Sequence, residues 1–237
     1  TAARILAMVL NCERWGQTEP AGEPCGECEN CCRTWSGAAG LDVIEIDAAS
    51  NRGVDDAREL RERAMYAASR EGHHKVYIVD EAHMLTREAW NALLKILEEP
   101  PPGVVFVFAT TEPNKIAQQA APVLSRLQRF DFRRIGAPAI RDRLRAVLDQ
   151  EKIEADDDAL TLIARQADGG MRDALSVLDQ CLSFGEGRVT AERVREILGL
   201  VADEVYVELL DAVAGHNPAR IYQVLDRIEE SGADLVE

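Results

Sequence analysis

The chain has 237 residues, of which 46% are hydrophobic, and it carries a formal net charge of -15. This length and composition can bury a substantial core, so we expect two or three compact units. The longest apolar runs, such as 104–109, are too short to cross a membrane and the first residues show no export signal, so the expected location is cytoplasmic. Because phosphates would repel the negative charge, any contact with DNA must be local or shared with partners.

Helix and strand patterns alternate over the first part of the chain. They predict a helix near 5–10, a strand at 42–47, a helix at 55–66, a strand at 76–81, a helix that Thr86 caps and Pro100 ends, and a strand at 104–111. Continuous apolar strands separated by helices are typical of a mostly parallel sheet that is covered on both faces. We therefore predict an α/β domain over residues 1–137.

From about residue 138 onward, amphipathic helices replace the strand patterns. Pro138 suits the first turn of one helix, and Pro218, after Asn217, repeats this arrangement. Further helices are predicted near 156–167, 171–183 and 190–198. We expect a small helical bundle at 138–200 and the start of another helical unit at 201–237, where two helices would rarely bury a core alone.

The strand at 76–81 ends in two adjacent carboxylates, Asp80 and Glu81. In an open parallel sheet, the carboxyl ends of the strands face the crevice where ligands bind. Two acids there suit Mg²⁺ and a water molecule: in nucleoside triphosphatases the first acid holds Mg²⁺, and a following glutamate can polarise the attacking water. The alternative is that both acids merely end the strand and cap the next helix.

Four cysteines follow the spacing CysX12CysX2CysX2Cys: Cys12, Cys25, Cys28 and Cys31. Four thiolates can enclose a tetrahedral Zn²⁺ completely, which describes a structural site rather than a catalytic one. Cys32 would also reach the fourth position, and free thiols in a loop are the alternative to any metal. Cys181 lies at helical spacing with leucines and is predicted to be a core residue.

Long stretches of the chain resemble the gamma and tau subunits of the bacterial DNA polymerase III clamp loader, which are AAA+ ATPases. The resemblance is carried by DEAHMLTREAWNALLKILEEPPPGVVFVFATTEP, and by LNC, DVIEIDAASN, LSR and GGMRDALSVLDQ, in this sequence. The resemblance covers nearly the whole chain. Within it, Asp80 and Glu81 correspond to the Walker B acids of the family. It implies a P-loop AAA+ parallel-sheet domain with a zinc module inserted at about 12–32, a helical lid at 138–200 and the beginning of a helical collar at 201–237.

The resemblance also implies roles for single residues. Thr111 corresponds to the sensor that contacts the γ-phosphate or its water, and Arg126 to the arginine finger that enters a neighbouring subunit's ATP site. Arg172 corresponds to a second sensor that couples the nucleotide to the angle between domains. Each residue also has a less specific interpretation. Thr111 would be a turn threonine, Arg126 a surface arginine, and Arg172 an arginine paired with Asp168 or Asp173. The Leu-Ser-Arg-Leu run departs from the usual Ser-Arg-Cys, and the loop before it is longer than usual.

The implied function is the ATP-driven loading of a ring-shaped sliding clamp onto primed DNA. The implied cofactors are ATP, Mg²⁺ and structural Zn²⁺, and the implied partners are the delta and delta-prime subunits, other gamma/tau copies, the sliding clamp and primer-template DNA. A P-loop needs GlyX4GlyLys followed by Ser or Thr, and the chain contains no such run. The resemblance places Thr1 directly after that motif, so we expect a fragment that is inactive alone.

Two other classes stay open. The first is a non-hydrolysing subunit like delta-prime, which the missing P-loop favours and which the paired acids, Thr111 and Arg172 disfavour. The second is a zinc-dependent nucleic-acid-binding module. The negative charge and the lack of a basic, aromatic-rich face make it a poor fit, since Arg141, Arg143 and Arg145 are predicted to form a solvated helix face.

Overall fold

The computed structural model describes residues 1–17, 22–38, 40–66, 68–70, 72–184, 187–199 and 203–230. The chain forms two compact units, Thr1–Phe130 and Asp131–Glu237, and each unit contains its own hydrophobic core. The α/β fold followed by a helical part is as predicted. The division at residues 137 and 200 stays a prediction, and residue 200 lies outside the described residues. Within the described ranges, no helix is long and apolar enough to span a membrane.

A three-stranded parallel sheet in the order β1-β2-β3 forms the centre of the first unit. Its strands are β1 (Val43–Asp47), β2 (Lys75–Asp80) and β3 (Val104–Phe108). The predicted strands are all present, although β3 ends three residues earlier than the pattern suggested. Because the strands are parallel, their carboxyl ends meet at one edge, where Asp47 is the register partner of Asp80.

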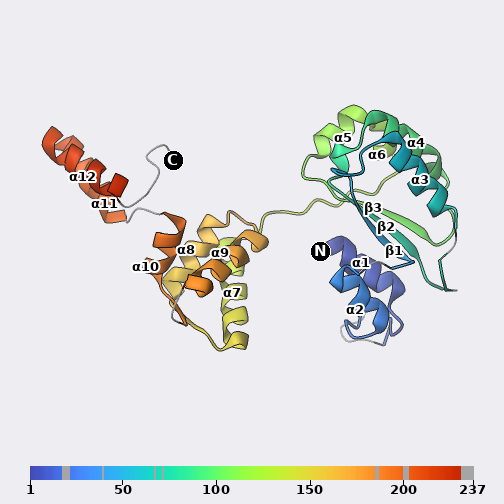
Figure 1. Ribbon diagram of the computed structural model, residues 1–237, viewed down its shortest axis with the longest axis horizontal. Coiled ribbons are helices and arrows are strands. Elements are labelled where there is room, and N and C mark those ends of the chain that lie inside the picture. Colours follow the sequence, from blue (N-terminus) through green and yellow to red (C-terminus); the bar gives the residue numbers. More distant parts are fainter. Residues whose placement is uncertain are drawn as a thin grey trace. The chain divides into compact units, whose positions relative to one another are not determined.

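Helices cover both faces of this sheet (Figure 1). They are α1 (Ala2–Asn11), α2 (Glu29–Ser36), α3 (Val54–Ala64), α4 (Arg87–Glu98), α5 (Pro113–Gln119) and α6 (Ala121–Leu124), with a short 3-10 helix η1 (Ala82–Met84). Successive strand residues point to opposite faces. Val76 and Ile78 therefore pack toward α1, whereas Tyr77 and Val79 join the larger cluster that includes α3 and α4.

The helix α4 begins as the sequence predicts. The Thr86 Oγ1 accepts a hydrogen bond from the Ala89 N–H at 3.2 Å, which satisfies one of the unpaired donors of the first turn. Trp90 and Leu93 lie on its buried face, and three consecutive prolines follow soon after its end at Glu98. The start of the helix is thus set by a capping threonine, its orientation by an apolar face, and its end by the prolines that follow.

Six helices make up most of the described part of the second unit: α7 (Ala137–Glu151), α8 (Asp157–Gln166), α9 (Met171–Phe184), α10 (Ala191–Leu198), α11 (Asp203–Ala214) and α12 (Pro218–Glu230). Pro138 lies in the first turn of α7, and Pro218 opens α12, as predicted. Cys181 is buried in the core beside Leu178. The structure adds one feature, a parallel pair of two-residue strands, β4 (Glu154–Ala155) and β5 (Arg188–Val189).

The last two helices bury little between them. Ala212 and Val224 are buried, whereas Tyr206, Leu210 and Tyr222 are all more than half exposed. A pair of helices with this exposure lacks a complete core of its own, as the sequence indicated.

Candidate nucleotide site and metal centre

The strand β2 delivers both predicted acids to the carboxyl edge of the sheet. Asp80 ends the strand, and its Oδ1 accepts a hydrogen bond from the Glu81 N–H at 2.9 Å. Glu81 has a φ of 47°, in the left-handed region that residues other than glycine rarely adopt. The next N–H, of Ala82, donates to the Ala109 carbonyl at 2.9 Å and ties this turn to the end of β3. Backbone strain of this kind is common at functional sites.

The residues that follow β3 face the same acids. The Thr111 Oγ1 donates a hydrogen bond to the Glu81 Oε2 at 3.4 Å. Asp80 and Thr111 are exposed and Glu81 is partly exposed, so all three can meet a ligand from solvent. Parallel pairing of β2 and β3 therefore brings together three of the predicted site residues from two separate segments of the chain.

His83 lies at this edge and was missed by the sequence reasoning. Its side chain is 8% exposed, with Nδ1 3.0 Å from the Thr110 Oγ1 and 3.4 Å from the Glu81 Oε2. Its Nε2 lies 3.4 Å from the Glu112 Oε1, which also binds the Lys115 Nζ at 2.6 Å. The Lys115 hydrogen bond, with a smaller contribution from His83, holds the pKa of Glu112 below its ordinary value. A histidine two positions after the paired acids was the available signal.

Asp47, at the end of β1, contributes another acid to the edge. Its Oδ1 accepts the Ala49 N–H and its Oδ2 accepts the Ser50 hydroxyl, both at 2.9 Å. These bonds hold the pKa of the Asp47 carboxyl below its usual value, with the backbone N–H of Ala49 the largest cause. The carboxylate of Asp47 is therefore engaged in the turn after β1.

Arg126 follows α6 and lies beside the far end of α4. Its Nη2 is 2.5 Å from the Glu98 Oε1, and its Nη1 donates to the Pro122 carbonyl. Glu98 is the last residue of α4, whereas the first residue of that helix comes soon after the paired acids. Arg126 therefore binds the C-terminal end of a twelve-residue helix, which spans roughly 18 Å.

Arg172 is the second residue of α9 in the second unit. Its side chain is exposed, and its guanidinium makes no ion pair or hydrogen bond with any described residue. Among the described residues, Arg172 forms no pair with Asp168 or Asp173, and Asp168 binds Arg134. Gly169 has a φ of 86° and lies so close to Arg134 that any side chain there would collide with it.

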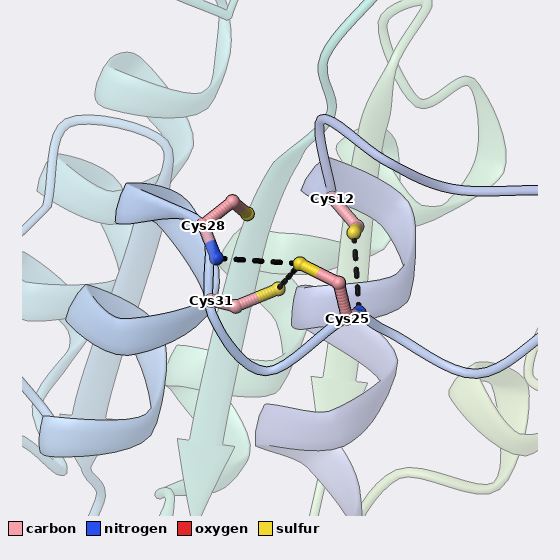
Figure 2. A group of neighbouring side chains, drawn as sticks. All are labelled: Cys12, Cys25, Cys28 and Cys31. Atoms are coloured by element: carbon pink, nitrogen blue, oxygen red, sulfur yellow. Dashed lines mark hydrogen bonds between the residues drawn. The ribbon is translucent and has the colours of Figure 1, made fainter. Parts of the chain in front are cut away.

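The four predicted cysteines form one cluster (Figure 2). The sulfurs of Cys12, Cys25, Cys28 and Cys31 all lie within 4.8 Å of one another. A tetrahedral site with Zn–S bonds of about 2.3 Å requires sulfurs about 3.8 Å apart. The Cys25 and Cys31 sulfurs are separated by 3.9 Å. This donor set and spacing fit Zn²⁺.

The structure distinguishes the two neighbouring cysteines that the sequence left open. Cys31 is buried beside Met8 within the cluster. Cys32 is exposed, and its sulfur lies 3.5 Å from the carbonyl oxygens of Gly26 and Glu27. The helical turn of α2 directs adjacent side chains apart, so the geometry favours Cys31 as the fourth ligand.

The local electrostatics also suit a cation. The Cys28 N–H points at the Cys25 sulfur from 3.3 Å and, together with the Glu27 N–H, lowers the pKa of Cys25 to about 6. Burial is the largest cause that raises the pKa of Cys31. A buried thiol of this kind gives up its proton readily when a cation compensates the thiolate charge, and a zinc ion would do so.

A separate cavity of about 500 Å³ is lined by residues from α1, α2, the β1 region and the segment 69–73. Its charged side chains include Arg4 and Glu45, which pair at 2.6 Å, and Arg33 and Glu29, which also pair at 2.6 Å. The paired acids after β2 do not line it. The cavity is therefore distinct from the carboxyl edge.

Solved structures share the fold of this chain. Two mutant forms of RuvB from Thermotoga maritima each align with a TM-score of 0.55 at 15% sequence identity. Each alignment covers 90% of this chain, and 71% and 72% of the respective RuvB chains.

Sequence comparisons then identify the family. A family model described as "DNA polymerase III, delta subunit" matches residues 1–136, and one described as "DNA polymerase III clamp loader subunit, ATPase lid domain" matches residues 139–187. The chain belongs to the family of DNA polymerase III clamp-loader subunits. The resemblance to gamma and tau subunits noted from the motifs is confirmed.

The curated relatives are longer than this chain. It is 43% identical over 234 residues to DNA polymerase III subunit tau of Bacillus subtilis, and 40% identical over 232 residues to subunit tau of Escherichia coli. These alignments cover 99% and 98% of this chain, but only 40% and 35% of the relatives. The similarity therefore concerns one part of each relative.

Proposed function

We propose that the protein containing this chain is a clamp-loader ATPase subunit of the gamma/tau type, which uses ATP to load a sliding clamp onto primed DNA. The observation that carries the proposal is the grouping of Asp80, Glu81 and Thr111 at one sheet edge. Membership of the clamp-loader family supports it. The proposed location is the cytoplasm.

The three edge residues have distinct roles in this proposal. Asp80 would hold Mg²⁺, which would supply positive charge opposite the phosphates. Glu81 orients the attacking water and accepts its proton, as a carboxylate next to a bound phosphate can. Thr111, already hydrogen-bonded to Glu81, contacts the γ-phosphate or that water. ATP itself is held by a P-loop, which the sequence of this chain does not include.

Arg126 serves the ATP site of a neighbouring subunit. It lies at the C-terminal end of α4, and its side chain is partly exposed, so it can face a neighbouring subunit. To act, its guanidinium leaves Glu98 and binds a phosphate of the ATP in the neighbouring subunit. Hydrolysis then depends on assembly of the subunits, because the arginine comes from another chain. The unpaired guanidinium of Arg172 suits the role of a second phosphate sensor.

The cysteine cluster would hold a structural zinc ion. Its four sulfurs leave no open coordination position, so the ion would supply folding energy to the segment around α2 rather than chemistry. The proposed partners are the delta and delta-prime subunits, other gamma/tau copies, the sliding clamp and primer-template DNA. The exposed face of α11 and α12 would begin the helical collar that joins the subunits.

A non-hydrolysing role like that of delta-prime is the second candidate. The family model that matches residues 1–136 carries the description "DNA polymerase III, delta subunit", which favours this second candidate. In that role the zinc module and Arg126 would matter, whereas Glu81 would have no substrate.

The deciding experiment uses the full-length natural protein, assembled with its partner subunits. We expect Mg²⁺-dependent binding of a fluorescent ATP analogue, and ATP hydrolysis. Glu81→Gln should keep nucleotide affinity while hydrolysis falls about 100-fold or more. Asp80→Asn should weaken the Mg²⁺ dependence of binding. If the natural protein binds no nucleotide with Mg²⁺ present, the delta-prime-like role replaces the ATPase role.

A further inference from the structure

We propose that His83 is a positioning residue for the proposed catalytic Glu81: it anchors one oxygen of the Glu81 carboxylate and leaves the other free for water. This inference rests on the proposed ATPase function and deepens it. His83 is not one of the implied Walker B or sensor residues. It is nevertheless the most buried charged or polar side chain at this edge of the sheet.

The location of His83 links the two strand ends. It belongs to η1, directly after the turn at Glu81, and its ring reaches the segment after β3. Nδ1 lies 3.0 Å from the Thr110 Oγ1, and Nε2 lies 3.4 Å from the Glu112 Oε1. The Thr110 Oγ1 in turn accepts the Glu112 N–H at 3.0 Å. The imidazole is therefore held at both nitrogens by residues that follow β3.

The Glu81 carboxylate is contacted on one oxygen from two sides. Its Oε2 lies 3.4 Å from the His83 Nδ1 and accepts the Thr111 hydroxyl at 3.4 Å. Its Oε1 has no hydrogen-bond partner among the described residues. A carboxylate accepts hydrogen bonds but donates none, so a proton on Nδ1, which also lies 3.0 Å from the Thr110 Oγ1, faces Oε2 favourably. The second oxygen stays available to a water molecule.

Positioning of this kind affects turnover rather than binding. A general base must lie within hydrogen-bond reach of the water that it activates, and a small misplacement is costly. Glu81 also sits on a left-handed turn, so its backbone direction is set independently by Asp80. The contact with His83 restricts the remaining freedom of Glu81, which is the rotation of its side chain.

Two conservative variants separate the contacts of the ring. In His83→Asn, the amide nitrogen can take the place of Nδ1 and still face Glu81. In His83→Gln, it can take the place of Nε2 and face Glu112, while the contacts of Nδ1 with Glu81 and Thr110 are both lost. Loss of a merely structural link to Thr110 would lower the thermal midpoint of this variant, whereas loss of Glu81 positioning would lower kcat alone.

The experiment measures kcat, KM, nucleotide affinity and thermal midpoint for the assembled full-length protein. We expect His83→Gln to lower kcat about tenfold with KM, nucleotide affinity and thermal midpoint unchanged. His83→Asn should recover most of that loss. In a Glu81→Gln background, His83→Gln should have no further effect on the residual rate, because both changes act through one group. The exposed His216, in the second unit, provides the control His216→Gln, which should change nothing.

The outcomes are distinguishable. If the natural protein hydrolyses ATP and His83→Gln turns over normally, His83 does not position Glu81 and the ATPase proposal stands. A loss of kcat in His83→Gln that comes with a lower thermal midpoint, or equal losses in the Asn and Gln variants, would assign His83 a structural role instead. If the natural protein hydrolyses no ATP, the proposed function itself fails, and this inference fails with it.

Discussion

The adjacent residues Cys31 and Cys32 give the sharpest contrast at the scale of single residues. Their chemistry is identical, but one sulfur lies in the cluster and the other lies against backbone carbonyls. We expect Cys31→Ser to reduce bound zinc well below one equivalent and to lower the thermal midpoint, because a zinc site needs all four thiolates. The measurements are metal analysis of the purified protein and thermal unfolding.

Cys32→Ser is the matched control, since it changes the same atom one position along α2. It should retain a full equivalent of zinc. Loss of zinc in Cys32→Ser with retention in Cys31→Ser would reverse the ligand assignment.

Tyr77 carries a second prediction at the residue scale. It is fully buried in β2, and its hydroxyl has no hydrogen-bond partner among the described residues. Burial also raises the pKa of this phenol. Since an unpaired buried hydroxyl is costly, Tyr77→Phe should raise the free energy of unfolding by about 1 kcal/mol. Denaturant titration measures it, and Tyr66→Phe, at an exposed tyrosine, should leave it unchanged.

At the scale of elements, α4 is the helix that relates the predicted site residues. Its N-terminus lies soon after the paired acids, and its last residue holds Arg126. This helix therefore connects the segment of the acids to Arg126, the proposed finger arginine. Its apolar face fixes the position of the helix by packing Trp90 and Leu93 in the core.

The cap of α4 is testable. Thr86→Ala should lower the free energy of unfolding of the first unit by about 1 kcal/mol, because the Ala89 N–H loses its acceptor. Thr86→Ser should retain most of the stability. The comparison is Thr190→Ala, which removes the equivalent cap of α10 and should destabilise the second unit instead. An unchanged denaturation midpoint in Thr86→Ala would mean that water replaces the cap at no cost.

At the scale of the whole molecule, the two cores predict separate unfolding. Each unit has its own cluster of buried residues, and the cysteine cluster belongs to the first. We expect two calorimetric transitions in the chain Thr1–Glu237. A zinc chelator should lower the midpoint of the transition assigned to Thr1–Phe130 and leave the other in place. A single transition, or an equal shift of both, would contradict this.

Much of the fold could be predicted from local patterns. The apolar runs predicted β2 and β3, and Thr86 predicted the start of α4. Pro138 and Pro218 predicted the starts of two later helices. These features depend on neighbours within a few residues, so a linear sequence displays them. The pairing of β4 with β5 was missed, because two residues leave no periodic pattern.

The candidate site was predictable only in part. The cysteine spacing, and the acids at the end of β2, pointed to their chemistry without coordinates. The contacts of His83 with Thr110 and Glu112 join positions 27 and 29 residues apart, and no local pattern encodes them. The choice of Cys31 over Cys32 depended on the direction of each side chain from α2.

The sequence by itself determined the family, the alternation of strands and helices, and which residue types could hold a metal or a nucleotide. Tertiary structure decided which of these residues meet. Parallel pairing of β2 and β3 places Thr111 beside Glu81, while Arg126 binds Glu98 at the end of α4. The physical reason is that periodicity and capping are short-range properties of the chain, whereas a site is assembled by packing between segments that are distant in sequence.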